Sequence, residues 1–170
     1  PVERQAVQVG RAFESGNLSL DDTAKLQTYF TGFLAASPQV SAIGLIQPDN
    51  RMMGIARLSM TLFKGPWPTQ ATFASRFEEL ARTQNPQWNP PIWSPRLGQS
   101  IATYYSPIIV KGTFVAVLVQ TVPVAELSRF LVQETYLDGV PFIYYAGNKL
   151  IAHPKLISWQ PIEPVSGTFS

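Results

Sequence analysis

The chain has 170 residues, of which 45% are hydrophobic and only 14% are charged. That composition supplies enough apolar material for one packed domain, or for one domain with a small second module, and it excludes a disordered chain. The 13 basic and 11 acidic residues leave a formal net charge of +2. Because the basic residues are scattered, nucleic acid is not an expected partner.

The sequence contains no cysteine, so neither a disulfide framework nor a thiolate metal site is expected. Its longest purely apolar run, Phe114 to Val119, is far shorter than the roughly 20 residues that a membrane-spanning helix needs. No signal peptide is predicted either. The chain begins at Pro1 and not at methionine, so we expect flanking segments outside this piece, including any membrane helices.

Two helices are predicted at the start of the chain. The first helix is indicated by apolar residues at helical spacing within residues 2–15, which are Val2, Ala6, Val9 and Phe13. A second helix should follow the break at residues 16–17, with a near capping box formed by Ser19 and Asp22, and should stop before Pro38. The two segments together are compatible with one long, interrupted helix.

From residue 40 the pattern becomes strand-like. Residues 40–60 are predicted to form two strands about the turn signal at residues 47–50, and a short helix is expected over residues 71–82. The proline-rich residues 84–96 that follow are predicted to be a long irregular loop.

The strongest local signal is a hairpin of two β-rich runs, residues 101–110 and 113–121, joined by Lys111 and Gly112. A proline then opens a helix predicted over residues 123–134.

Residues 141–154 are predicted to form a smaller hairpin about Gly147 and Asn148. Helices and hairpins in this order indicate an antiparallel sheet covered by helices, in the α+β class.

Residues 104–131 (YYSPIIVKGTFVAVLVQTVPVAELSRFL) and 142–154 (FIYYAGNKLIAHP) resemble the extracellular double-Cache sensor family. The run LIAHP after a Gly-Asn hairpin and the strand-to-helix junction PVAEL carry the resemblance. It implies a long N-terminal helix packed on a PAS-like antiparallel sheet that binds a ligand, and part of a second, smaller PAS-like module nearer the membrane. The implied limits are 1–37 for the helical region, 38–136 for the distal module with its connecting helix, and 137–170 for the incomplete proximal module.

The main hairpin also predicts which side chains share a face. Counted from its two-residue turn, Ser106 pairs with Val117 and Tyr104 with Val119, which places these four side chains and Thr121 on one face. The alternate residues of both strands would lie on the other face.

Six residues form the candidate ligand site, an apolar lining with a few polar groups: Trp88, Trp93, Arg96, Tyr104, Ser106 and Thr121. Each has a structural alternative, since the rings fit core packing, Ser106 the end of strand pairing, and Arg96 a solvated cation. By the resemblance, amino-acid-binding members carry an aspartate where Thr121 stands, and an Arg-x-Trp-Tyr run in the region of residues 81–96. Because both charged anchors are absent, we expect a neutral or aromatic ligand, or a carboxylate met by Arg96, and not a zwitterionic amino acid.

No catalytic, metal or cofactor site is predicted. His153 is the only histidine, and we expect it to make a structural hydrogen bond. The acid pairs at residues 21–22 and 78–79 fit helix-cap or solvated roles better than general acid–base catalysis. No phosphate-binding loop is present.

Residues and resemblance together predict the periplasmic or extracellular sensor of an inner-membrane signal-transduction receptor, with a small molecule as its partner, and not an enzyme. The output domain, an adenylate or guanylate cyclase or a histidine kinase, is expected outside the chain, and the full receptor is compatible with a homodimer. Two alternatives stay open: an unrelated α+β enzyme that uses His153 with Ser158, and an interaction module that dimerises through residues 1–36.

Overall fold

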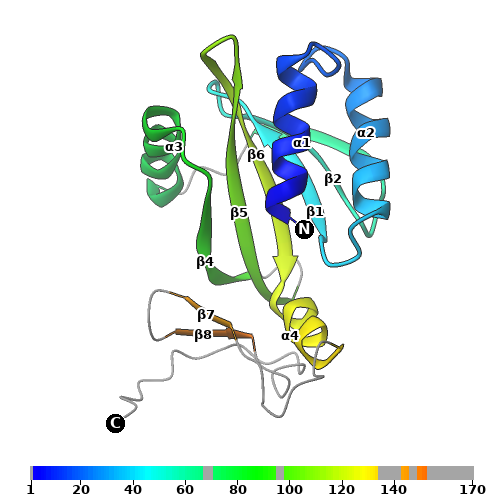
Figure 1. Ribbon diagram of the computed structural model, residues 1–170, viewed down its shortest axis with the longest axis vertical. Coiled ribbons are helices and arrows are strands. Elements are labelled where there is room, and N and C mark those ends of the chain that lie inside the picture. The colour runs from blue at the N-terminus through cyan, green and yellow to red at the C-terminus, as the bar shows by residue number, and fades with distance from the viewer. Residues whose placement is uncertain (1, 67–70, 95–97, 134–142, 146–148, 153–170) are drawn as a thin grey trace. The chain divides into compact units, whose positions relative to one another are not determined.

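The computed structural model describes residues 2–66, 71–94, 98–133, 143–145 and 149–152 (Figure 1). The helices are α1 (Val2–Glu14), α2 (Thr23–Ala35), α3 (Ala71–Thr83) and α4 (Val124–Gln133). The strands are β1 (Ala42–Ile46), β2 (Arg51–Ala56), β3 (Leu62–Pro66), β4 (Gln87–Ser94), β5 (Gln99–Val110), β6 (Thr113–Pro123), β7 (Ile143–Tyr145) and β8 (Lys149–Ala152). Each predicted helix and hairpin is present, and the α+β class is confirmed.

The chain divides into two compact units, each built from two segments. The first consists of Pro1–Asn89 and Thr103–Thr121, and the second of Pro90–Ala102 and Val122–Ser170. The last of these boundaries falls at Val122, so α4 belongs to the same unit as the small hairpin. The predicted limit at residue 136 lies outside the described residues.

Six strands form one sheet in the order β3-β2-β1-β6-β5-β4. The central strand β1 is antiparallel to both neighbours, with Gly44 opposite Gly54 of β2 and Val119 of β6. β5 and β6 are joined by Lys111 and Gly112, which have φ values of 50° and 77°. Positive φ at both central residues is the signature of the type I′ hairpin, so the predicted turn is confirmed.

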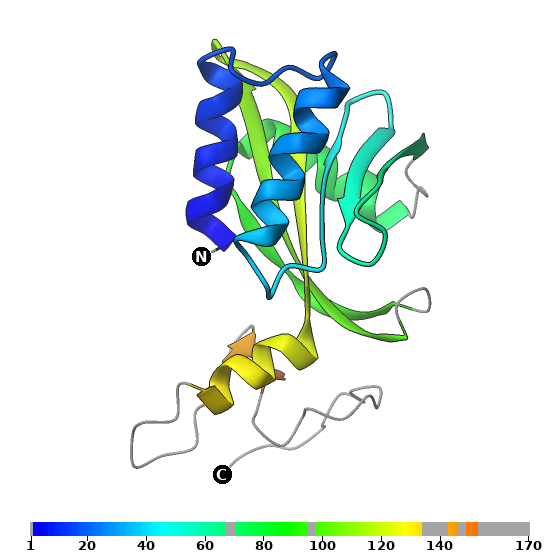
Figure 2. The ribbon, with the colours of Figure 1, turned by 90° about the vertical axis from the view of Figure 1, so that its right-hand side faces the viewer.

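Helices α1 and α2 lie side by side over one face of the sheet (Figure 2) and do not form one long helix. The chain reverses after α1 through Gly16, whose φ of +74° suits glycine, and Leu18 anchors the link by being buried. The core beneath the two helices consists of fully buried apolar side chains. Its members that are at most 1% exposed include Val9, Phe30, Leu34, Ile43, Leu45, Ile55 and Leu118.

The two acid pairs have the structural roles expected of them. Asp22 is itself the N-cap of α2, because its Oδ1 accepts a hydrogen bond of 3.0 Å from the backbone N–H of Lys25. The predicted capping box, which placed Asp22 one turn inside the helix, is therefore wrong in its register. Glu78 and Glu79 are exposed on α3, as a solvated helix face requires.

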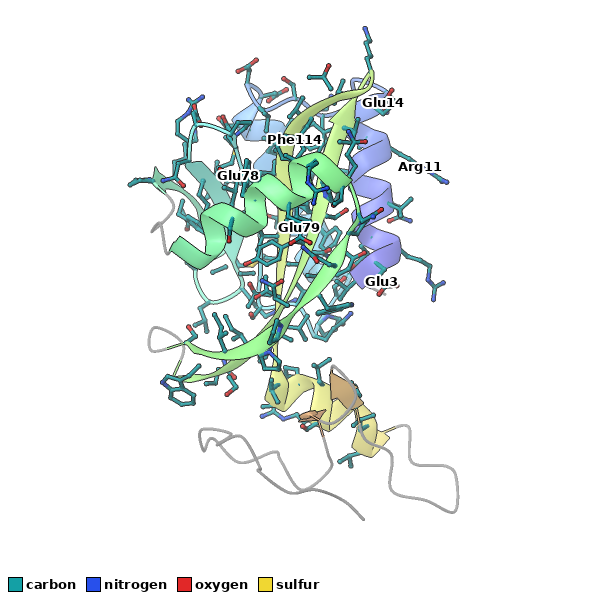
Figure 3. All side chains as sticks on the ribbon, turned by 90° about the vertical axis from the view of Figure 1, so that its left-hand side faces the viewer. Glu3, Arg11, Glu14, Glu78, Glu79 and Phe114 are labelled. Atoms are coloured by element: carbon teal, nitrogen blue, oxygen red, sulfur yellow. The ribbon has the colours of Figure 1, made fainter. Side chains whose placement is uncertain are left out.

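The opposite face of the sheet is covered by α3 (Figure 3). Leu80 of α3 is fully buried in an apolar cluster with Ile46, Tyr105, Val117 and Val119. At the margin of this cluster, Phe77 meets Phe114 edge to face with ring centroids 5.3 Å apart. The first unit thus has helices on both faces of its sheet.

The two edge strands were not predicted. β4 runs through Pro90 and Pro91, so the irregular loop expected over residues 84–96 is wrong for Gln87–Ser94. Proline is tolerated at a sheet edge because the outer side of an edge strand needs no N–H donor. At the other edge, β3 pairs with β2 and places Phe63 opposite Gly54.

The second unit contains α4 and the antiparallel hairpin β7–β8. Val124 and Leu131 of α4 are buried, and Leu127 and Ile143 pack against them. The expected turn at residues 147–148 and the end of the helix at residue 134 lie outside the described residues.

Candidate functional site

The sheet face toward α3 continues beyond its apolar cluster as a surface of small residues. Two successive rows across β2, β1 and β6 read Gly54–Gly44–Val119 and Ala56–Ala42–Thr121. We call Ala42, Gly44, Gly54, Ala56 and Thr121 the small-residue floor. Ala42, Ala56 and Thr121 are half-buried, so this part of the face is less completely covered than the cluster beside it.

At the two glycines of the small-residue floor, β1 and β2 approach each other closely. A Cβ on Gly54 would lie 2.6 Å from the carbonyl oxygen of Ile43, and a Cβ on Gly44 would lie 2.8 Å from that of Met53. The backbones of β1 and β2 therefore approach too closely for a side chain at either position, and the side chains of Phe63 and Met52 lie over the two buried glycines. Glycines within strand patterns are the sequence signal for such an approach.

Thr121 supplies the one polar side chain of the small-residue floor. Its carbonyl oxygen accepts hydrogen bonds from the backbone N–H and the Oγ of Ser41, at 2.8 and 3.1 Å. These bonds hold the end of β6 in place, and the hydroxyl is the group that Thr121 can offer to a ligand. None of the five floor residues carries a charge.

Trp88 and Tyr104, two of the predicted site residues, lie together beside α1. Their ring centroids are 5.1 Å apart, and the indole Nε1 of Trp88 donates a hydrogen bond of 3.1 Å to Oε1 of Glu3. Burial, and after it the negative charge of Glu3, raises the pKa of the Tyr104 hydroxyl. The first turn of α1 is thereby attached to β4 and β5.

The predicted sharing of a face between Tyr104 and Thr121 is wrong. It is Tyr105 that packs with Val117 and Val119, and Thr121 follows these two on the same face of β6. Since successive side chains of a strand point to opposite faces, Tyr104 points away from the small-residue floor. Register counted from a turn holds only while both strands stay strictly paired, and one unpaired residue exchanges the faces beyond it.

Within the part of the chain that the structure describes, the other predicted site residues do not gather around Thr121. Ser106 is buried, and Trp93 is 40% exposed in the second unit. Arg96 lies outside the described residues, as do His153 and Ser158.

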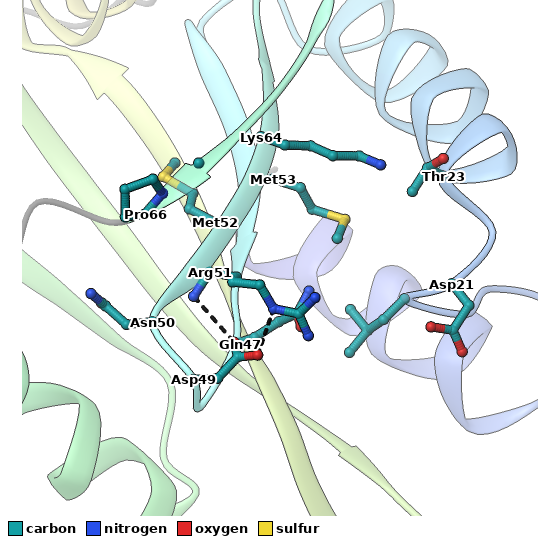
Figure 4. A pocket seen from close by; sticks show the side chains of 12 residues that line it. Asp21, Thr23, Gln47, Asp49, Asn50, Arg51, Met52, Met53, Lys64 and Pro66 are labelled. Carbon is teal, nitrogen blue, oxygen red and sulfur yellow. Dashed lines mark hydrogen bonds and ion pairs between the residues drawn. The ribbon is translucent and has the colours of Figure 1, made fainter.

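A cavity that the sequence pattern does not predict lies at the start of α2. It has a volume of about 570 Å³ and is lined by the link before α2, by the β1–β2 turn and by β3 (Figure 4). Within it, Nε of Arg51 is 2.5 Å from Oδ2 of Asp49. Desolvation acts to raise the pKa of Asp49, but the hydrogen bonds and positive charge of Arg51 outweigh it and lower that pKa. No motif marks these residues, which come from three separate elements.

Among the residues that the structure describes, no three histidine, cysteine or acidic side chains gather closely enough to hold a metal ion. None of the described helices has the length and apolar character needed to cross a membrane.

Several solved structures with a similar fold are sensory or ligand-binding domains of receptors. The sensory domain of the Campylobacter jejuni chemoreceptor Tlp3 matches with a TM-score of 0.67 at 16% identity, over 94% of this chain and 68% of that domain. The chain has the fold of extracellular sensory domains. The extracellular domain of a protein described as a histidine kinase, mmHK1S-Z3, matches with a TM-score of 0.64 at 13% identity, over 92% of this chain and 65% of that one.

The sensory-domain fold is shared with a third receptor. The ligand-binding domain of the Pseudomonas fluorescens chemoreceptor CtaA, in complex with L-serine, matches with a TM-score of 0.61 at 14% identity, over 90% of this chain and 64% of that domain. Structures of Tlp3 contain isoleucine, L-valine or L-norvaline. The chain spans about two thirds of each of these domains. No family model and no curated protein sequence matches it. The antiparallel sheet with covering helices that the resemblance to double-Cache sensors implies is confirmed.

Proposed function

We propose that this chain is the ligand-sensing part of a transmembrane receptor and that it binds a small molecule over the small-residue floor. The observation that carries the proposal is the sensory-domain fold, which is shared with chemoreceptors and a histidine kinase at TM-scores of 0.61 to 0.67. The floor supports it, because Ala42, Ala56 and Thr121 are small and only half-buried on the α3 side of the sheet. Ligand sites of this kind combine an apolar lining with a few polar groups.

The ligand class follows from the chemistry at Thr121. A hydroxyl donates or accepts one neutral hydrogen bond, whereas an ammonium group is held best by a carboxylate. We therefore propose a neutral or aromatic ligand, or a carboxylate met by Arg96, with Thr121 as its polar contact. Trp88 and Tyr104, on the other face of the sheet, are not ligand contacts in this proposal and serve to attach α1 to β4 and β5.

A ligand screen with variants of Thr121 tests the proposal. Small neutral, aromatic and acidic compounds are screened by thermal shift, since a ligand that binds only the folded state raises the melting temperature. A bound compound should lose affinity by about 1 kcal/mol in Thr121→Val, which keeps the shape and removes the hydroxyl. Thr121→Asp should shift preference toward amino acids by roughly tenfold. Equal binding by the wild type and both variants would contradict the site.

A periplasmic location, a homodimeric receptor, and a cyclase or histidine kinase as output are the wider part of the proposal. The sequence of the full gene product tests it directly. Membrane-spanning segments before Pro1 and after Ser170, followed by a catalytic domain, are expected. A gene product without any spanning segment would refute the receptor assignment.

A further inference from the structure

The cavity at the start of α2 lies at the β1–β2 turn, and its lining residues Met53 and Lys64 are on the side of the sheet that α1 and α2 cover, whereas Met52 faces α3. Met53 and Lys64 are opposite each other in β2 and β3, and Met53 alternates with the residues that face α3. We infer that this cavity is a second binding site, for a small zwitterion. Its volume of about 570 Å³ is in the range of known small-molecule sites.

Four charged side chains line the cavity, and two of them neutralise each other. Arg51 holds Asp49 through the ion pair, and its Nη2 also donates to Oε1 of the buried Gln47 at 3.0 Å. A bound molecule would have to break these contacts to use either charge. The pair therefore shapes the rim of the cavity more than it attracts a ligand.

The other two charges, Lys64 and Asp21, are of opposite sign. Neither makes an ion pair or side-chain hydrogen bond within the described part of the chain. Figure 4 shows the Lys64 side chain pointing toward the first turn of α2. A ligand that carries a carboxylate for Lys64 and an ammonium group for Asp21 would satisfy both.

The remaining residues that line the cavity also favour a zwitterionic ligand. The start of α2 does not attract a simple anion, because Asp22 already occupies the N-cap and Asp21 adds a second negative charge. Leu20 and Met53 add apolar surface to the lining, which suits the aliphatic part of an amino acid or a short peptide.

Four compounds of one chain length test the charge pattern on the whole chain. They are 6-aminohexanoate, its isomer norleucine with adjacent charges, hexanoate with the carboxylate alone, and hexylamine with the amine alone. At least one of the two zwitterions should bind roughly tenfold more tightly than both singly charged compounds, as measured by calorimetry. Tighter binding of 6-aminohexanoate indicates a peptide-like ligand, and tighter binding of norleucine an amino acid. If hexanoate or hexylamine binds as well as the tighter of the two zwitterions, or if neither zwitterion binds, the inference is wrong.

Two charge-neutralising variants locate the binding. Lys64→Met and Asp21→Asn should each weaken the preferred zwitterion by roughly tenfold. The controls Lys25→Met and Asp22→Asn remove neighbouring charges that do not line the cavity, and asparagine still caps the helix; they should bind as the wild type does. Binding that Lys64→Met and Asp21→Asn leave unchanged, but that Thr121→Val weakens, would refute this site while supporting the proposed function.

Discussion

The two faces of the sheet in the first unit differ in how they are filled. Under α1 and α2, large side chains such as Phe30 and Leu118 are fully buried, whereas toward α3 the strands end in the small-residue floor. Both faces are built from the same strands, because odd residues of β1 (Ile43, Leu45) point to the helix pair and even residues (Ala42, Gly44) to the floor. One set of strands can therefore combine a dense core with a surface of small residues, because side chains at alternate positions of a strand point to opposite faces and can differ in size.

The largest expected effect on stability comes from a substitution in the dense face, which is the side of the sheet under α1 and α2. Phe30→Ala removes a fully buried ring and should lower the free energy of unfolding by about 3–5 kcal/mol. Urea denaturation measures the loss. Val7→Ala on the exposed side of α1, where the side chain is 54% accessible, is the control and should change little. A similar loss in both variants would mean that the face under the helices is not the main source of stability.

Adding one methyl group to the small-residue floor should have a smaller but clear effect. In Gly54→Ala the new Cβ would lie 2.6 Å from the Ile43 carbonyl oxygen, so β1 and β2 must separate, at a cost of about 1–3 kcal/mol. Gly32→Ala in α2 is the matched control. Nothing lies within 4 Å of its Cβ, and alanine should stabilise the helix by roughly 0.5–1 kcal/mol. The close approach of the two strands would be disproved if both variants were stabilised in thermal unfolding.

Gln120 is a buried polar residue within the dense face, and its replacement tests the packing there. It is fully buried on β6 opposite Ile43, and neither its Oε1 nor its Nε2 has a hydrogen-bond partner among the described residues. Gln120→Met should therefore raise the free energy of unfolding by about 1 kcal/mol, because a desolvated amide is replaced by an apolar chain. Gln8→Met on the exposed side of α1 is the control. A loss of stability in Gln120→Met would show that the amide is bonded.

The smallest expected change in stability comes from the titration of Tyr104, beside α1. Its pKa is raised by burial and by Glu3, so the protonated phenol contributes stability below the unfolded-state value of about 10. This contribution is lost as the pH rises through the raised pKa of the folded protein. Denaturation between pH 8 and 11 should show a steeper alkaline loss in the wild type than in Tyr104→Phe. Equal slopes would mean that Tyr104 titrates as a free tyrosine does.

Much of the fold could be predicted because its elements leave local marks. The helical spacing of Val2, Ala6, Val9 and Phe13 and the two-residue turn at Lys111 and Gly112 each depend on neighbours in the chain. The strands β3 and β4 escaped prediction because edge strands depend on pairing with distant residues, and prolines in β4 resemble a loop. The candidate site was predicted only in part, since Trp88 and Tyr104 do meet but Thr121 lies on the other face.

The sequence by itself determined the α+β class, the order of helices and hairpins, and the absence of a charged anchor at position 121. These properties follow from composition, periodicity and single residue types, which no packing can alter. Only the tertiary structure decided that Tyr105 and not Tyr104 faces α3, that Gly44 and Gly54 meet across two strands, and that a cavity opens at the start of α2. Such facts depend on register and on contacts between distant segments, where a shift of one residue exchanges the two faces of a strand.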